Sequence, residues 1–161
     1  MLSFQPAHTS DAALLSSLAF ASKSHWSYSA AQLRRWTSAL RVTPSDIAGW
    51  PTVTAWLGER AVGFYQLRME PDGSSRLEHF WLLPEFIGKG FGKQMFADAV
   101  ERSHALGATG LIVESDPNAE AFYLACGTVR IGEVPAPIEG AEDRVLPVLH
   151  MPFERRGATL R

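Results

Sequence analysis

The chain has 161 residues and a formal net charge of −2, with 46% hydrophobic and 20% charged residues. These values indicate one globular domain that is long enough to bury a core. The net charge lacks the positive excess that is typical of nucleic-acid-binding proteins. No apolar run approaches the length of a membrane span, and we expect no signal peptide. Cys126 is the single cysteine, so an internal disulfide is impossible. We therefore expect a cytoplasmic protein that contacts neither membrane nor nucleic acid.

The first half of the chain predicts one strand and three helices before the main run of strands. Ser29 and Gln32 form a capping box for the second helix. Thr43 and Pro44 are favourable at the start of the third, which Gly49 ends. We expect these elements, in chain order, at residues 2–5, about 12–21, about 30–40 and from Pro44 to Gly49.

The rest of the chain predicts six further strands and two helices. Segments rich in β-branched and aromatic residues indicate the strands, and apolar residues at helical spacing indicate the helices. We expect strands at residues 52–57, 61–67, 76–83, 110–114, 128–134 and 144–151, and helices at about 90–106 and from Asn118 to Cys126. The first two of these strands form a hairpin, and the strand–helix–strand unit at 77–114 implies a parallel pair. Residues 154–161 are expected to be a frayed tail.

A glycine-rich turn lies between the strand at 76–83 and the following helix. Gly88, Gly90 and Gly92 allow the backbone to approach an anion, and the first amides of a helix are free to bind one. Lys89 and Lys93 add positive charge. The spacing fits neither a P-loop nor the dinucleotide-binding fingerprint. The turn therefore predicts a phosphate site of another kind.

The sequence I-G-K-G-F-G at residues 87–92 resembles the acetyl-CoA loop of the GCN5-related N-acetyltransferases (the GNAT family). Gly90 and Gly92 match the loop, whereas Ile87 stands where that family usually has Arg or Gln. A second segment, N-A-E-A-F-Y-L-A-C-G at residues 118–127, matches the family's later motif at Asn118, Ala121, Tyr123 and Gly127. The two motifs occur in the expected order with a strand between them.

This resemblance implies an α+β fold in which residues 1–153 form a single N-acetyltransferase domain. A central mixed sheet would be flanked by helices, and its fourth and fifth strands would splay apart around acetyl-CoA. The implied activity is direct transfer of the acetyl group to an amine, of a small molecule or a protein, without a metal. The alternative is a module of the same fold that binds CoA or acyl-CoA as a sensor without turnover. A different acyl donor or a hydroxyl acceptor also stays open, and dimerisation is common in the family.

The resemblance also assigns roles to individual residues. Tyr123 would protonate the leaving thiolate, and a backbone amide near Leu82, where the family commonly has a bulge, would stabilise the oxyanion. Glu78 or His79 would act as the base, or water alone would; strand alternation would place these two on opposite faces, with Glu78 beside Phe80 and Leu82. The residues expected to bind the cosubstrate are Trp81, Leu82, Leu83, Gly88, Lys89, Gly90, Phe91, Gly92, Lys93, Asn118 and Tyr123.

The acceptor site is expected in the segment S-H-W-S-Y at residues 24–28. His25, Trp26 and Tyr28 crowd together where two helices meet, and in the GNAT family the loop between the first two helices lines the acceptor pocket. The alternative is that Trp26 and Tyr28 only pack the helices together.

Overall fold

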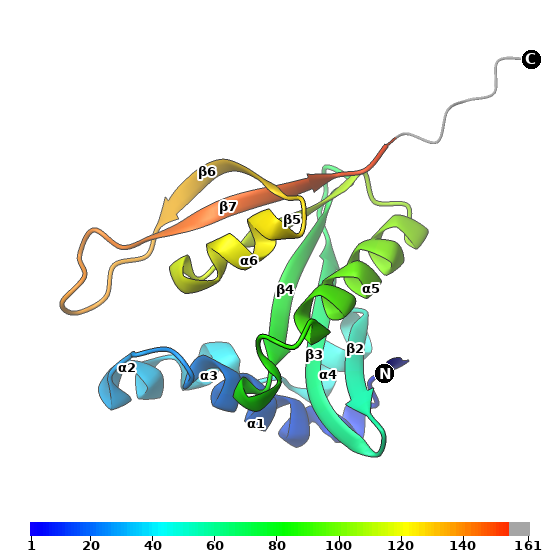
Figure 1. The fold of residues 1–161 in the computed structure, drawn as a ribbon, viewed down its shortest axis with the longest axis horizontal. Helices are drawn as coiled ribbons and strands as arrows, with labels where there is room; N and C mark the ends of the chain where they lie inside the picture. Colours follow the sequence, from blue (N-terminus) through cyan, green and yellow to red (C-terminus); the bar gives the residue numbers. More distant parts are fainter. Residues whose placement is uncertain (155–161) are drawn as a thin grey trace, which may run out of the picture.

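The computed structural model describes residues 1–154, in which seven strands form one mixed sheet with the order β1-β2-β3-β4-β5-β7-β6 (Figure 1). The strands are β1 (Leu2–Pro6), β2 (Thr52–Leu57), β3 (Arg60–Met69), β4 (Ser75–Leu82), β5 (Gly110–Glu114), β6 (Val129–Pro135) and β7 (Val145–Pro152). The helices are α1 (Ala12–Lys23), α2 (Ala30–Arg35), α3 (Thr37–Leu40), α4 (Pro44–Gly49), α5 (Phe91–Ala105) and α6 (Glu120–Ala125). Short 3-10 turns are η1 (Thr9–Asp11), η2 (Pro84–Phe86) and η3 (Pro117–Ala119). Apart from Glu154, the predicted frayed tail lies outside the described residues.

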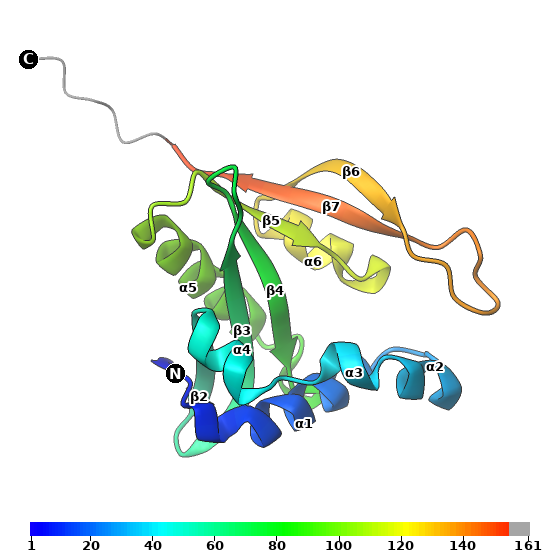
Figure 2. The ribbon, with the colours of Figure 1, turned by 180° about the vertical axis from the view of Figure 1, so that it is seen from behind.

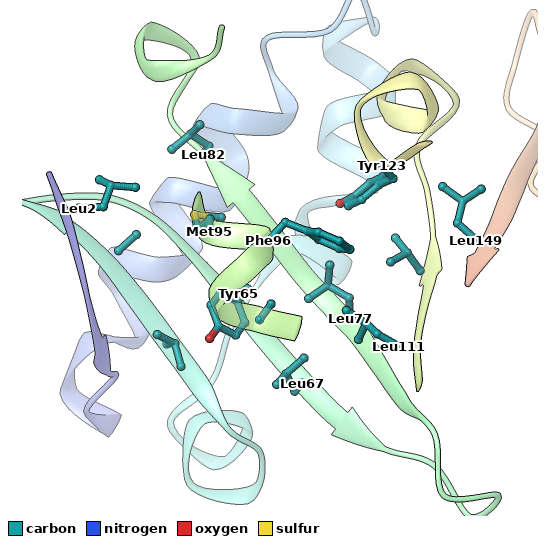
Figure 3. Close-up of a cluster of buried hydrophobic side chains, with 14 of the residues drawn as sticks. Leu2, Tyr65, Leu67, Leu77, Leu82, Met95, Phe96, Leu111, Tyr123 and Leu149 are labelled. Atoms are coloured by element: carbon teal, nitrogen blue, oxygen red, sulfur yellow. The ribbon is translucent and has the colours of Figure 1, made fainter. Parts of the chain in front are cut away.

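Two hydrophobic clusters cover the two faces of the sheet. Helices α5 and α6 pack on one face, where Tyr65, Met95, Phe96 and Leu111 are buried (Figure 3). Helices α1, α3 and α4 cover the other face over β2–β4, around the buried Phe64 (Figure 2). A ligand between β4 and β5 can therefore be approached from two separate sides.

Two helix boundaries differ from the sequence-based expectation. The single helix predicted at 30–40 is two helices, α2 and α3, separated at Trp36, whose ring lies edge-on against Tyr28 at a centroid distance of 4.7 Å. The predicted N-cap at Asn118 is also wrong. The turn η3 precedes α6 and is capped by Asp116, whose carboxylate accepts the Asn118 amide hydrogen bond, and Ala119 is the N-cap of α6.

The predicted parallel pair is β4 with β5, and it is very short. The strands are in register only at Ser75–Leu111 and Arg76–Ile112. The Ser75 hydroxyl bonds to Ser103 and to the Gly110 carbonyl, which holds this end together. Gly110 lies so close to β7 that a Cβ would be 2.6 Å from the His150 ring. Beyond this joint the strands diverge, as the resemblance implied (Figure 2).

A bulge in β4 resets its alternation at Glu78. Gln66 of β3 faces His79 and the next residue, Leu67, faces Leu77, so Glu78 has no partner across the pair. Leu77 and Phe80 consequently pack in the same core cluster, although alternation would separate them. The family resemblance had placed a bulge near Leu82. The structure instead has it four residues earlier, at Glu78.

Candidate functional site

A cavity of about 510 Å³ opens where β4 and β5 diverge. Its wall combines both sequence motifs with the end of α1. The lining residues are Ser22, Trp26, Leu77, Glu78, Phe80, Trp81, Leu82, Ile87, Gly88, Gly90, Gly92, Lys93, Val113, Glu114, Ser115, Asp116, Asn118, Ala119, Phe122 and Tyr123. The splay predicted from sequence therefore coincides with a cavity large enough for part of an organic ligand.

The glycine loop has the backbone geometry of an anion site. Gly88 and Gly90 both have φ of 82°, a conformation that costs other residues about 1–2 kcal/mol. Gly90 is the N-cap of α5 and brings no capping side chain. Within residues 1–154, none of the amides from 88 to 93 donates a hydrogen bond. These amides, at the positive end of a 15-residue helix, are available to an anion.

The third glycine of the loop brings the two motifs together. A Cβ on Gly92 would lie 3.0 Å from the Phe122 ring, so glycine allows α5 to approach α6 closely. The Phe122 ring in turn packs against Tyr123 and Phe80. The loop and the second motif are thus held in fixed relation across the cavity.

Tyr123 reaches the cavity from α6, and its hydroxyl makes no hydrogen bond to another group in residues 1–154. Its ring is buried between Phe80 and Phe96, at centroid distances of 5.8 and 5.7 Å. Figure 3 shows the hydroxyl pointing from α6 toward the side of β4. Burial raises the pKa of the Tyr123 phenol well above its usual value, so the hydroxyl stays protonated at neutral pH.

Strand β4 presents an unpaired edge to the cavity. After Arg76 it is paired only with β3 among the described strands, so its other backbone edge is free. Trp81 and Leu82 line the cavity on this edge. Gly63 of β3 allows β3 and β4 to pack tightly next to this edge, because a Cβ on Gly63 would be 2.5 Å from the Trp81 carbonyl oxygen.

The two candidate bases lie in different surroundings. Glu78 lines the cavity, and its carboxylate contacts Arg76 at 3.6 Å and Arg68 at 4.0 Å. It lines the same cavity as Phe80 and Leu82, as expected from alternation, although the bulge leaves it without a partner on β3. His79 is absent from the cavity wall: its ring packs on Phe64 and accepts a hydrogen bond from the Trp81 indole at 3.0 Å. Burial lowers the pKa of His79.

Glu114 is a second carboxylate on the cavity wall. It lies 2.6 Å from the Arg76 guanidinium, which also contacts Glu78. Arg76 therefore links carboxylates on the two diverging strands.

The predicted acceptor residues are only partly brought together. Trp26 lines the cavity, and the exposed His25 stacks edge-on against it at 4.8 Å. Tyr28 does not line the cavity. Its hydroxyl donates a hydrogen bond to Asp116 and accepts one from Asn118, and both of these residues are in the cavity wall. Among the residues expected to hold the cosubstrate, three lie beside the cavity rather than in its wall: Leu83, Lys89 and Phe91.

A buried polar cluster, here called the Asp116 cluster, was not anticipated from sequence. It consists of Lys23, Tyr28, Asp116, Asn118 and Arg144. The Asp116 carboxylate accepts hydrogen bonds from Lys23 at 2.6 Å and Tyr28 at 2.7 Å, and Arg144 lies 3.5 Å away. Burial alone would raise the pKa of Asp116, but the Lys23 ammonium and the other donors lower it below its usual value.

Sequence patterns had only weak signals for this cluster. Lys23 ends an apolar helix, and Arg144 is 28 residues from Asp116 along the chain, so nothing local joins them. Within residues 1–154, no group of three or more His, Cys, Asp or Glu side chains is placed to hold a metal ion. In the same range, no helix has the length and apolar character that crossing a membrane requires.

Comparison with known proteins places the chain in a family. The model of the Acetyltransferase (GNAT) family matches residues 15–128. A GCN5-related N-acetyltransferase (aminotransferase, class II) from Rhodopseudomonas palustris is 26% identical, with 92% of each chain covered and a TM-score of 0.71.

Two more distant structures share the fold. The PaiA N-acetyltransferase of Thermoplasma acidophilum, solved in complex with coenzyme A, is 15% identical; 95% of this chain and 99% of that one are covered, with a TM-score of 0.75. The ribosomal-protein-S18-alanine N-acetyltransferase of Escherichia coli is 13% identical, with 100% and 99% covered and a TM-score of 0.73. Since the family model spans well over half of the sequence, this chain belongs to the acetyltransferase (GNAT) family.

Proposed function

We propose that this protein is an N-acetyltransferase that moves an acetyl group from acetyl-CoA directly to an amine. The observation that carries the proposal is one cavity with free loop amides at one wall and the Tyr123 phenol at another. The first feature suits a phosphate-containing cosubstrate, and the second suits release of a thiol. A cytoplasmic location and a homodimer stay expectations.

The residues present fit acetyl-CoA. The amides of residues 88–93 and Lys93 would hold the pyrophosphate, although Ile87 offers no side-chain donor. The free edge of β4 at Trp81 and Leu82 would pair with the pantetheine amides as an added strand does. Asn118 would contact the same arm, and a β4 amide near Leu82 would stabilise the oxyanion.

The reaction requires three events that this chain's groups can serve. The amine must lose its proton, which at pH 7 costs a lysine-like amine roughly 4–5 kcal/mol. Its nitrogen then forms a bond to the thioester carbonyl carbon, and the carbon–sulfur bond breaks. Glu78 would take the first amine proton, directly or through water, and the Tyr123 hydroxyl would give its proton to the departing sulfur; the second proton, which the nitrogen releases once it is bonded to carbon, would restore the Tyr123 hydroxyl.

Replacing Gly90 with alanine should raise the KM for acetyl-CoA about tenfold. The new Cβ strains a position with φ of 82° and alters the amide cradle. Gly107→Ala is the matched control, because Gly107 has φ of 84° at the other end of α5 and also has open space around it. Both variants should lose similar thermal stability. An equal KM change in both would contradict phosphate binding at this loop.

Replacing Glu78 with glutamine should lower kcat about 10²-fold and remove the limb of the pH–rate profile that reports the base. Glu114→Gln is the control, since Glu114 lines the same cavity and shares the contact with Arg76. An unmoved profile in Glu78→Gln would exclude Glu78 as the base. The profile of Glu114→Gln would then show whether the proton goes to that carboxylate.

A thiol-release assay with acetyl-CoA and a panel of amines tests the proposed function. Release that depends on an amine, with an acetylated amine as product, is the expected result. Tight binding of acetyl-CoA with no release on any amine would instead favour the sensor module. The Tyr123 hydroxyl in the cavity favours the enzyme, because a sensor does not need a proton donor there.

A further inference from the structure

The Asp116 cluster holds more positive than negative charge. Lys23 and Arg144 are both about nine-tenths buried, with side chains 10% exposed, and the single carboxylate between them is 11% exposed. Buried charges are normally paired one to one. The neighbouring Arg35–Glu139 pair is exposed and already neutral by itself. One positive charge in the cluster therefore lacks an anion among the described residues.

The hydrogen bonds of the cluster show the same imbalance. Both oxygens of Asp116 are occupied, one by Lys23 and Tyr28, the other by the backbone and side chain of Asn118. Among residues 1–154, Lys23 has Asp116 as its only acceptor, and the Arg144 guanidinium donates only to the Ala136 carbonyl and the Tyr28 hydroxyl. The cluster thus has spare donors and no spare acceptor within residues 1–154.

Aromatic rings enclose the two cations. The Lys23 ammonium lies 4.4 Å from the centre of a Trp36 ring and 5.9 Å from that of Trp81, and Arg144 lies 5.4 Å from Trp36. Cation–π contacts of this kind stabilise a buried cation but do not neutralise it. Burial and the nearby Arg144 charge lower the pKa of Lys23 in spite of Asp116, which agrees with a shortage of negative charge.

The cluster borders the cavity on the side away from α5 and α6. Lys23, Tyr28 and Trp36 come from α1 and the segment after it, which cover the opposite face of the sheet (Figure 2). Ser22, Trp26 and Asp116, next to these residues in sequence or space, are in the cavity wall. Lys23 and Arg144 are not in the wall themselves but lie directly behind Asp116, so a second substrate that enters from this face would reach them beside Asp116.

We propose that the acceptor is a small amine that carries a carboxylate, such as an amino acid, and that Arg144 and Lys23 bind this carboxylate. The substrate assignment rests on the proposed function. The carboxylate supplies the missing negative charge and accepts the spare hydrogen bonds, and its amine extends into the cavity toward Glu78 and Tyr123. An uncharged or cationic group in the same place would leave the buried charge unpaired.

Pairs of acceptors that differ only in the carboxylate test this proposal. Thiol release is measured for free amino acids and for their carboxamides, and kcat/KM should favour the acids at least tenfold, the factor that 1.4 kcal/mol represents. Arg144→Gln should lower kcat/KM for the acid at least tenfold more than for the carboxamide. Arg144→Lys should keep most of the preference for acids over carboxamides. This variant also tests the site if the glutamine variant does not fold. Arg35→Gln, which removes only the exposed pair, should leave the ratio as it is.

A calorimetric titration of the protein–CoA complex with the same acids and carboxamides separates this proposal from the proposed function. Thiol release with carboxamides as good as with acids, or an equal effect of Arg144→Gln on both, would overturn the carboxylate site and leave the enzyme standing. Binding of acids but not carboxamides, without thiol release on any amine, would support the site and contradict the enzyme. Failure of both binding and release would overturn both.

Discussion

Replacing Tyr123 with phenylalanine should lower kcat by about 10²–10⁴-fold while acetyl-CoA still binds. The change removes only the hydroxyl that would protonate the leaving sulfur, and general acid catalysis typically contributes that factor. The ring's packing against Phe80 and Phe96 is preserved, so the cavity keeps its shape. Steady-state thiol release gives kcat, and calorimetry gives the affinity.

Tyr65→Phe is the matched control for this variant. Tyr65 is also buried, but its hydroxyl donates to Asp98 on the far side of α5 and does not line the cavity. This variant should lose stability and keep its kcat. A Tyr123→Phe enzyme with normal kcat would remove the phenol from the mechanism, whatever the control does.

Replacing Asp116 with asparagine should destabilise the protein by about 3 kcal/mol. Removing one partner of a buried ion pair typically costs 3–5 kcal/mol, and here it leaves two cations, Lys23 and Arg144, without their shared anion. For a chain of this size the loss corresponds to about 6–12 °C in Tm. Urea denaturation at pH 7 measures it, with Glu139→Gln as the control because that ion pair is exposed.

The stabilisation of the folded protein by Asp116 should also weaken as the pH falls. The folded-state pKa of Asp116 lies below the ordinary value of 3.8. Its stabilisation is therefore complete above about pH 4 and is lost as the pH falls through the folded-state pKa. The gap in unfolding free energy between the wild type and Asp116→Asn should therefore be constant above about pH 4 and narrow as the pH falls below that value. A gap that does not narrow, or that is absent at pH 7, would contradict the ion pair.

Local patterns in the sequence were sufficient to predict most of the fold. Each strand was expected within one residue of its ends, apart from the hairpin strand at 61–67, which extends two residues further to Met69. The parallel pair was also expected from the strand–helix–strand pattern, whereas its splay was implied only by the resemblance to the GNAT family. The break at Trp36 was missed because it depends on the contact with Tyr28, which helix periodicity does not encode.

The candidate site divides in the same way. The loop glycines, Asn118 and Tyr123 were found because each belongs to a motif with fixed spacing. Glu78 lines the cavity and His79 does not, as strand alternation led us to expect, whereas the bulge at Glu78 was not predicted there because it depends on the register with β3.

Long-range contacts account for what the sequence did not indicate at all. Lys23 and Asp116 are 93 residues apart, and only the folded sheet brings them together. Arg144 approaches them from the loop between β6 and β7, whose path no local pattern predicts.

The most direct test of the account is a calorimetric titration of the full chain with acetyl-CoA. We predict saturable binding of one acetyl-CoA per chain, weakened by Gly90→Ala and retained by Gly107→Ala and Tyr123→Phe. Absence of binding would mean that a loop with Ile87 in place of the usual Arg or Gln holds no pyrophosphate. The cavity between β4 and β5 would then have to serve another ligand, and the acetyltransferase proposal would be wrong.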